Sequence, residues 1–550
     1  MQNQAENYTS LREEWLTALL PLLLLALGLR LLVFSHLRML NPDGMVYILQ
    51  AKALYLHQSD KLLQVYPWPT NLAFFLAGTY HLVGDWILAG RLVSLGFSLA
   101  TIVPLYFFYR RYLSRMVTAA LVLFYVASPI FVEYSSQILR GPEFWFFFCA
   151  GLWGYGLLQS TEKSRPGICF LTSSAFLLAA WSRIEGLLPL LLATGGVLLS
   201  ARRHGWRGLA AYFAPYAAAL AVAFLPLFSW QTVSPNNNLF KIIYSGLVDR
   251  ISAAWSHFVW LKSSLRELQK SPPFGVAPYF FKELRHHLFF LALGITGYTL
   301  ARLFGLPYLA TLVIGRFRRQ LPATPAPDHD TAAPRPPRLL LLTAGGGILI
   351  IYIEVLLRWA SSPRFAALVF FPALIFAAPG CRWLLELAGP GGKSPEAVAK
   401  QRRNLVLFGL LLALICLPST LKKSRTDRST AFKEIGLELA GSRLTEGAPL
   451  KLCGTSRKIL YTHFFAYLDK AEILSPEQYC TVYYIRDLDL DTLIRNGCTL
   501  LLLSDRDHGR QRFREKLQKR NDLSVSVICE RSNTELHGRV TLYKLSRKNQ

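Results

Sequence analysis

Apolar blocks of membrane-spanning length recur along residues 1–420, and short basic segments separate them. The first block runs from Trp15 to Phe34 and is interrupted only by Arg30. About 20 apolar residues in a helix cross the ~30 Å hydrocarbon core of a bilayer. Because lipid offers no hydrogen-bond partners, each crossing must satisfy its backbone within a helix. We therefore predict an α-helical polytopic membrane protein.

The net charge of +26 is distributed in a way that argues against a nucleic-acid partner. The chain is 52% hydrophobic and only 17% charged. Its basic clusters, at 110–115, 202–207, 316–319 and 393–403, lie between apolar blocks rather than on one soluble segment. Short basic loops between spans are what the positive-inside rule produces. We interpret these loops as cytoplasmic and predict that the chain binds no nucleic acid.

The basic loops also predict the topology. Segment 116–160 lies between two basic loops, so it must cross twice and turn outside at 133–143. The same reasoning makes 167–200 a hairpin with an outer turn at 182–186. Counting every apolar block gives about eleven crossings. With the basic loops in the cytoplasm, the N-terminus is cytoplasmic as well. An odd number of crossings then places the C-terminal part outside.

The chain divides by composition into two domains. Residues 1–420 form the predicted transmembrane catalytic domain, with outer loops at 36–87 and 231–286 and a Pro- and Ala-rich cytoplasmic linker at 320–338. A helix spanning 287–315 is expected to bend near Gly305 and Pro307. Residues 421–550 instead alternate short apolar runs with helical stretches. This pattern predicts a small soluble α/β domain outside the membrane.

Four of the eight cysteines lie in the predicted outer domain, at Cys453, Cys480, Cys498 and Cys529. An even number in an extracytoplasmic domain permits disulfide bonds, whereas isolated buried thiols are the alternative. The spacing fits no CxxC zinc motif, and the sequence leaves the pairing open.

The first outer loop carries an acidic candidate for chemistry. Asp43 follows the first span in a Pro-Asp-Gly sequence, which we expect to form a turn at the membrane surface. A carboxylate there suits a general base that takes the proton of an acceptor hydroxyl. An ordinary turn aspartate is the alternative.

Further charged residues lie at the other predicted outer turns. Guanidinium groups match phosphate oxygens bidentately, so the arginines are candidates for binding a phosphate. The alternatives are snorkelling to lipid headgroups, an ion pair between Arg183 and Glu185, and a helix-dipole role for Glu143. The residues concerned are Arg140, Glu143, Arg183, Glu185, Arg358 and Arg364.

No metal or cofactor motif stands out. The sequence has no HExxH, Walker or dinucleotide-binding fingerprint. The adjacent His286 and His287 would point in different directions on a helix. We predict neither a metal site nor a cofactor.

Several short elements, weak alone but in a specific order, make the chain resemble the GT-C superfamily of integral-membrane glycosyltransferases, close to the protein O-mannosyltransferase and aminoarabinose-transferase branch. The resemblance covers most of residues 15–420. Its elements lie at 43–53, 66–69, 84–86, 89–94, 127–129, 140–143, 181–187, 362–365 and 371–372.

This resemblance implies a GT-C fold and an inverting transfer of a hexosyl or pentosyl group from a polyprenyl-phosphate-sugar donor. It implies Asp43 as the general base and Glu143 as a second acid that orients the acceptor. Arg364, with Arg140 or Arg183, would hold the donor phosphate. Tyr47, Glu185 and Arg358 are further candidates for the substrate pocket.

The implied acceptor is an envelope glycan, lipid or protein at the outer face of a bacterial inner membrane. Membrane lipids are the other expected partners. Two departures weaken any link to mannose or to protein acceptors: Gly44 follows Asp43 where mannosyltransferases have a Glu, and position 184 is Ile where the family often has Pro.

Two alternatives to a glycosyltransferase remain. A transporter or flippase for a lipid-linked saccharide usually shows inverted repeats and a binding site at the membrane midplane. The two halves show no convincing repeat, and the polar interruptions lie at predicted outer turns, which favours surface chemistry. A non-catalytic scaffold would instead use 231–286 and the C-terminal domain.

Overall fold

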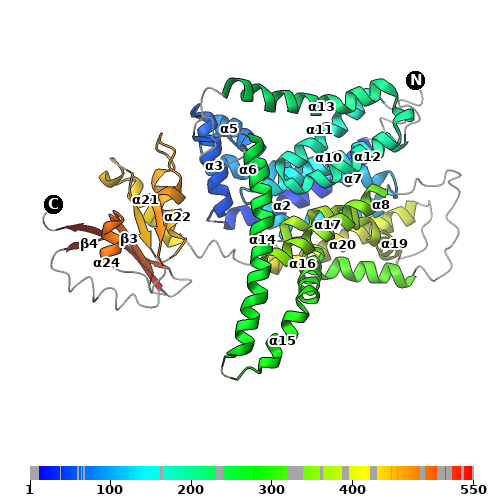
Figure 1. Cartoon of the computed structure of the whole chain (residues 1–550). Helices are drawn as coiled ribbons and strands as arrows, with labels where there is room; N and C mark the ends of the chain where they lie inside the picture. The colour runs from blue at the N-terminus through cyan, green and yellow to red at the C-terminus, as the bar shows by residue number, and fades with distance from the viewer. Residues whose placement is uncertain are drawn as a thin grey trace. The chain divides into compact units, whose positions relative to one another are not determined.

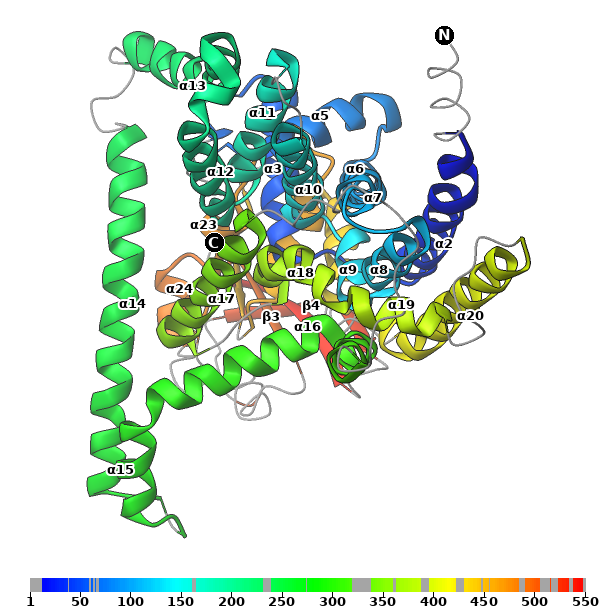
Figure 2. The same ribbon diagram turned by 90° about the vertical axis from the view of Figure 1, so that its right-hand side faces the viewer.

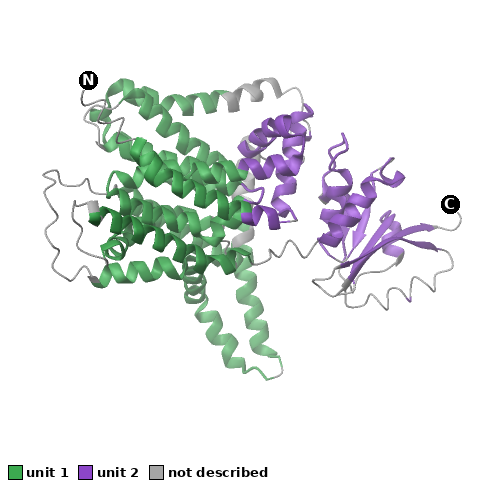
Figure 3. Ribbon diagram, turned by 180° about the vertical axis from the view of Figure 1, so that it is seen from behind, with its two compact units in different colours: residues 1–31, 94–135, 140–421 green, residues 32–93, 136–139, 422–550 purple. Residues whose placement is uncertain are grey.

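The computed structural model forms two compact units, which Figure 3 colours separately. Unit 1 comprises residues 1–31, 94–135 and 140–421, and unit 2 comprises 32–93, 136–139 and 422–550. The described residues begin at 12 and omit mainly 161–164, 231–238, 319–337, 387–394, 422–429, 484–489, 505–514, 516–522, 534–537 and 548–550, with a few positions around 38, 60, 65, 274, 361, 447 and 455.

Unit 1 is all helical (Figure 1). Its elements are η1 (Trp15–Leu19), α2 (Leu20–His36), α6 (Trp86–Ala100), α7 (Ile102–Arg110), α8 (Arg115–Ala127), α9 (Pro129–Ser135), α10 (Arg140–Ser160), α11 (Pro166–Ser182), η2 (Ile184–Gly186), α12 (Leu187–Leu199), α13 (Ala201–Trp230), α14 (Leu239–Lys270), α15 (Pro278–His286), α16 (Leu288–Arg318), α17 (Arg338–Arg358), η3 (Pro363–Ala366), α18 (Ala367–Ala373), η4 (Leu374–Ala377), α19 (Ala378–Glu386) and α20 (Pro395–Leu421). α2 and α6 each continue into unit 2.

The helices have the length and composition of membrane spans. Among the described residues, 6 helices are long and apolar enough to cross a membrane, or up to 7 if the bent pair α8 and α9 is one span. Three shorter apolar helices are 71–83, 166–182 and 184–199. Each predicted crossing coincides with a helix, the less apolar ones with α10 and α13. The predicted polytopic helical fold is therefore confirmed, and the chain is an integral membrane protein.

A buried arginine supports the break between α8 and α9, which bend by 60°. The break at Ser128 and Pro129 interrupts the helical hydrogen bonds and exposes carbonyl groups that need other donors. Arg30 is fully buried and donates to the Val126 carbonyl at 3.3 Å and to Ser98 Oγ at 2.8 Å. The residue that interrupts the first apolar block therefore serves packing inside unit 1.

Two predictions about the later spans have opposite outcomes. The predicted bend in the 287–315 helix is confirmed, because α16 has a non-helical Gly305 with a φ of 72°. The prediction that 231–286 is a long loop is wrong, because α14 and α15 occupy most of it and lie side by side (Figures 1 and 2). The predicted linker 320–338 lies outside the described residues, apart from Arg338.

The loop prediction for 231–286 did not take account of an apolar stripe on its helices. Phe258 and Leu265 of α14 form a small core with Phe281 of α15 and Leu288 of α16. These positions repeat at helical spacing within segments that also carry many polar residues. The many polar residues of α14 and α15 therefore made the segment look like a loop, although one apolar face packs the helices together.

Unit 2 contains the predicted C-terminal α/β fold together with helices of the segment predicted to form the first outer loop. Its five-stranded sheet has the order β2-β1-β3-β5-β4, with β1 parallel to both neighbours and β5 antiparallel to β3 and β4. The elements are α3 (Pro42–Tyr55), α5 (Asn71–Val83), α21 (Thr430–Ala440), η6 (Arg443–Thr445), β1 (Leu452–Gly454), α22 (Ile459–Tyr467), α23 (Pro476–Tyr479), β2 (Cys480–Val482), α24 (Leu490–Arg495), β3 (Leu500–Ser504), β4 (Leu523–Asn533) and β5 (Gly538–Arg547).

One disulfide bond links two of the four cysteines of the C-terminal part. Cys453 of β1 is bonded to Cys498, which precedes β3, with the Cα atoms 6.0 Å apart. Both cysteines belong to the core of the sheet, and Cys480 and Cys529 are free thiols. The structure thus supplies the pairing that the sequence left open.

Within unit 2, a lysine of the segment predicted to form the first outer loop makes hydrogen bonds to the C-terminal fold. Lys52 of α3 is 3% exposed, and its Nζ donates to the carbonyl oxygens of Tyr467, Leu468 and Glu472 at 3.1–3.3 Å. The carbonyls of Tyr467 and Leu468 lie at the end of α22, where helical acceptors lack partners. Burial lowers the pKa of Lys52 to about 8, although the charges of Asp469 and Glu472 act in the opposite direction.

A buried histidine makes the stability of unit 2 depend on pH. His463 of α22 is fully buried, and neither of its ring nitrogens has a hydrogen-bond partner among the described residues. Its ring is stacked on Tyr479 and tilted against Tyr467. Burial lowers the pKa of His463 from 6.5 to about 4. The unfolded chain therefore binds more protons than the folded chain between these two pH values.

We expect unit 2 to lose about 2 kcal/mol of unfolding free energy between pH 7 and pH 5, because stability falls as pH drops through this window. His463→Phe keeps an aromatic ring between the two tyrosines and should remove most of this loss. Thermal unfolding of the full chain in detergent at both pH values measures the effect. His286→Gln, at an exposed position of unit 1, is the control and should keep the wild-type pH dependence. An unchanged dependence in His463→Phe would contradict the assignment.

Candidate functional site

The charged residues of two predicted outer turns gather at one end of unit 1. α10, α11 and α12 follow one another along the chain and lie side by side (Figures 1 and 2). Because neighbouring helices joined by short connections run in opposite directions, the start of α10 meets the end of α11 and the start of α12. This end carries Arg140, Glu143, Arg183 and Glu185, which we call the α10–α12 cluster.

Glu143 is the most deeply buried member of the α10–α12 cluster. It lies in the first turn of α10 and is 1% exposed. Ser182 and Arg140 are the groups that interact with its carboxylate. Its two oxygens make no hydrogen bond of normal geometry within the described part of the chain. Burying a carboxylate costs free energy unless it is paired and hydrogen-bonded. Its position also suits the positive end of the helix dipole.

Arg183 and Glu185, also in the α10–α12 cluster, form a largely buried ion pair. Arg183 NH2 donates to Glu185 Oε1 at 2.8 Å, and each side chain is 10% exposed. The guanidinium carbon of Arg183 lies 4.7 Å from the centre of the Phe365 ring, in η3. Arg140 also interacts with Glu185. The segment that contains Arg364 therefore reaches the α10–α12 cluster through Phe365.

The two arginines of the predicted third outer turn, Arg358 and Arg364, are not shown in contact with the α10–α12 cluster. Arg358, at the end of α17, has a side chain that is 63% exposed and pairs with Glu354 at 3.6 Å. No described contact joins it to the α10–α12 cluster. Arg364 belongs to η3, but its side chain lies outside the described residues, so its proposed phosphate contact stays a prediction.

Asp43 lies in unit 2, on the first turn of a helix. The expected Pro-Asp-Gly turn is wrong, because Pro42 begins α3 and Asn41 is its N-cap. The backbone N–H of Asp43 donates to Asn41 Oδ1 at 3.0 Å, and Asn41 Nδ2 donates to Gln137 Oε1 at 3.1 Å. Proline at the first helical position after an asparagine cap is a common way for a helix to begin. Asp43 is therefore held on a rigid element rather than on a mobile turn.

A tyrosine of the C-terminal fold is within electrostatic range of this aspartate. Tyr461 of α22 is 6% exposed, and burial together with the negative charge of Asp43 raises its pKa to about 12. Tyr47, one turn after Asp43 on α3, is 5% exposed. Sequence reasoning missed Tyr461, because nothing in the chain order links residue 461 to residue 43.

Gly44 has a packing reason that explains one departure from the mannosyltransferase pattern. A Cβ at Gly44 would lie 3.2 Å from Ile138 Cβ, and one at Gly90 would lie 2.7 Å from Ile138 Cδ1. Ile138 thus occupies the space that side chains at both positions would need. A side chain at position 44 would need Ile138 to shift by a few tenths of an ångström.

The described residues offer charged groups but no evident metal site. Among them, no group of three or more His, Cys, Asp and Glu side chains is placed to hold a metal ion. The α10–α12 cluster offers guanidinium groups in a partly desolvated setting, where they interact strongly with an anion. Asp43 offers a half-buried carboxylate, with Tyr47 one turn later on α3 and Tyr461 within electrostatic range. The two groups belong to different units.

Comparisons with known proteins give matches among solved structures. No family profile matches the sequence, and no curated protein matches it. The structure is similar to ArnT from Cupriavidus metallidurans bound to undecaprenyl phosphate, with a TM-score of 0.43 and 12% identity, over 96% of this chain and 98% of that one.

It is also similar to the Archaeoglobus fulgidus oligosaccharyltransferase in complex with Zn and sulfate, with a TM-score of 0.49 and 12% identity, over 88% of this chain and 67% of that one. At these TM-scores the likeness assigns no role to any residue of this chain.

Proposed function

We propose that this protein is an inverting glycosyltransferase that moves a sugar from a polyprenyl-phosphate-sugar donor to an envelope glycan, lipid or protein. The observation that carries the proposal is the α10–α12 cluster, where two arginines and two carboxylates gather at one end of a membrane-spanning bundle. Charged groups are costly at such positions and usually mark a functional site.

On the donor side, Arg183 and Arg140 are suited to bind the phosphate. A phosphate leaving group gains negative charge as the bond to the sugar breaks, and fixed cations lower the barrier to that step. Glu185 and Phe365 hold the Arg183 guanidinium in place, which avoids the cost of ordering it during reaction. Arg364 is the further candidate, because it directly precedes Phe365 in η3.

On the acceptor side, Asp43 is the proposed general base. The acceptor oxygen attacks the anomeric carbon and the bond from that carbon to the phosphate oxygen breaks. The acceptor proton passes to Asp43, and polyprenyl phosphate leaves. A direct displacement of this kind inverts the anomeric centre. Glu143 is proposed to orient the acceptor, and Tyr47 and Tyr461 to line the space beside Asp43.

The proposed location is the inner membrane of a bacterium, with the N-terminus in the cytoplasm and residues 421–550 outside. The basic loops at 110–115 and 202–207 support this orientation. Labelling of an introduced cysteine in the sheet of unit 2 from either side of the membrane tests it.

The test of the proposed function is a turnover assay with the purified chain in liposomes. The donors are polyprenyl phosphates that carry a radiolabelled hexose or pentose, offered with envelope glycolipid acceptors. The proposal expects the label to leave the lipid donor and polyprenyl phosphate to accumulate, both only when the chain is present. Intact labelled donor that merely changes leaflet would instead show a flippase.

A further inference from the structure

A second polar site lies at the opposite end of the same helices. A pocket of about 290 Å³ is lined by residues of α10, α12 and α13, which are Tyr155, Leu158, Gln159, Gly196, Val197, Ser200, Arg203 and His204. Tyr155 is twelve residues after Glu143 on α10, which corresponds to about 18 Å along the helix axis. The pocket is therefore separate from the α10–α12 cluster.

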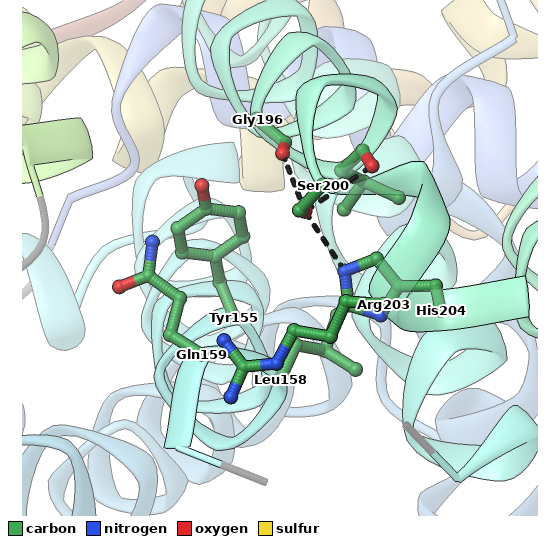
Figure 4. A pocket seen from close by; sticks show the side chains of 8 residues that line it. Tyr155, Leu158, Gln159, Gly196, Ser200, Arg203 and His204 are labelled. Carbon is green, nitrogen blue, oxygen red and sulfur yellow. Dashed lines mark hydrogen bonds between the residues drawn. The ribbon is translucent and has the colours of Figure 1, made fainter. Parts of the chain in front are cut away.

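The polar side chains of the pocket are held in order. Ser200 Oγ donates to the Gly196 carbonyl at 2.8 Å and lies 3.0 Å from His204 Nε2 (Figure 4). Because the serine hydrogen points to the carbonyl, His204 Nε2 carries the hydrogen of the second bond. Tyr155 is 7% exposed and His204 is 8% exposed. Figure 4 shows the Arg203 side chain extending across the pocket toward Tyr155 and Gln159.

A glycine keeps the pocket open around the tyrosine. A Cβ at Gly196 would lie 2.1 Å from Tyr155 Oη and 3.1 Å from its ring carbon. Any side chain at position 196 would therefore displace the tyrosine hydroxyl from the pocket wall.

The lining is rich in hydrogen-bond donors and positive. It offers a guanidinium, an imidazole, two hydroxyls and an amide, and no carboxylate is among the lining residues. Such a set suits a phosphate group, since guanidinium donors match its oxygens. A volume of about 290 Å³ accommodates a headgroup phosphate rather than a whole lipid.

The position of the pocket favours a lipid as the source of that phosphate. The 21 residues of α10 have the length needed to cross the hydrocarbon core, and a crossing there would place its two ends near the two headgroup layers. Arg202 and Arg207 are exposed beside the pocket and would attract an anionic surface. Basic pockets between membrane helices are known to take anionic headgroups.

We propose that this pocket binds the phosphate of an anionic membrane phospholipid, at the end of the bundle away from the α10–α12 cluster. Arg203 provides the charge and Tyr155 provides a hydrogen bond, while His204 holds Ser200 in the pocket wall. The site does not depend on the proposed glycosyltransferase activity.

The test is native mass spectrometry of the full-length protein in detergent, titrated with dioleoylphosphatidylglycerol and, separately, with dioleoylphosphatidylcholine. Arg203→Gln should weaken retention of phosphatidylglycerol about tenfold. Arg202→Gln removes the neighbouring arginine, which does not line the pocket, and should change retention less than twofold. Tyr155→Phe should give an intermediate loss, because it removes one donor and keeps the ring.

Competition by inorganic phosphate separates the two sources of the ligand. If 10 mM phosphate, about ten-thousandfold above a Kd of about 1 μM, leaves lipid retention unchanged, the site takes a lipid headgroup. If phosphate displaces the lipid in wild type but not in Arg203→Gln, the pocket is a site for free phosphate. Equal losses in Arg203→Gln and Arg202→Gln, or equal retention of the two lipids by the wild type, would overturn the proposal.

Discussion

Replacing Asp43 by asparagine is expected to lower the rate of sugar transfer by about 10²–10⁴-fold, the contribution of a positioned general base. Asparagine keeps the size of the side chain and the start of α3, because the helix cap is provided by Asn41. The change should therefore leave expression, membrane insertion and thermal stability close to wild type. The measurement is kcat with saturating lipid donor and acceptor.

The matched control is Asp85→Asn. Asp85 is an exposed aspartate that accepts hydrogen bonds from the backbone N–H groups of Ile87 and Leu88, at 2.8 Å each. Asparagine can also cap a helix, so transfer should remain near the wild-type rate in this variant. Turnover by Asp43→Asn within threefold of wild type would exclude Asp43 as the base.

Removing the charge of Arg183 is expected to lower kcat/KM for the lipid donor by about 10²–10³-fold, as for loss of one group that stabilises a transition-state anion. The single variant Arg183→Gln would leave the largely buried Glu185 carboxylate without its partner, and this loss would itself destabilise the fold. The double variant Arg183→Gln, Glu185→Gln removes both charges and preserves the shape of the pair. It separates a binding role from a structural one.

The double variant should fold with near wild-type stability and still show the loss in kcat/KM. Arg207→Gln, at the other end of the helices, is the control and should keep normal donor dependence. Full activity of the stable double variant would mean that the ion pair only holds η2 in place. The phosphate role would then pass to Arg140 or Arg364.

Much of the membrane part could be predicted because hydropathy and charge act locally along the chain. The first span, the bend at Gly305 and the α/β pattern of 421–550 all follow from short stretches of sequence. The pairing of Arg183 with Glu185 could also be anticipated, because the two residues are only two positions apart. The roles assigned to these residues stay predictions.

The remaining features depend on contacts between distant parts of the chain. Lys52 donates to carbonyl groups at the end of α22, more than 400 positions away, and the charge of Asp43 acts on Tyr461 over a similar separation. No periodicity in the sequence links such positions. The helical start of α3 could have been predicted, since the Asn-Pro-Asp sequence is also a helix-start signal. The turn prediction gave that signal too little weight.

The most direct test of the account is the stereochemistry of the transferred sugar, determined by NMR of the product formed from a donor of known anomeric configuration. A direct displacement assisted by Asp43 predicts a product of opposite configuration and one polyprenyl phosphate released for each sugar transferred. A product with retained configuration, or a donor that the purified chain never cleaves, would contradict it.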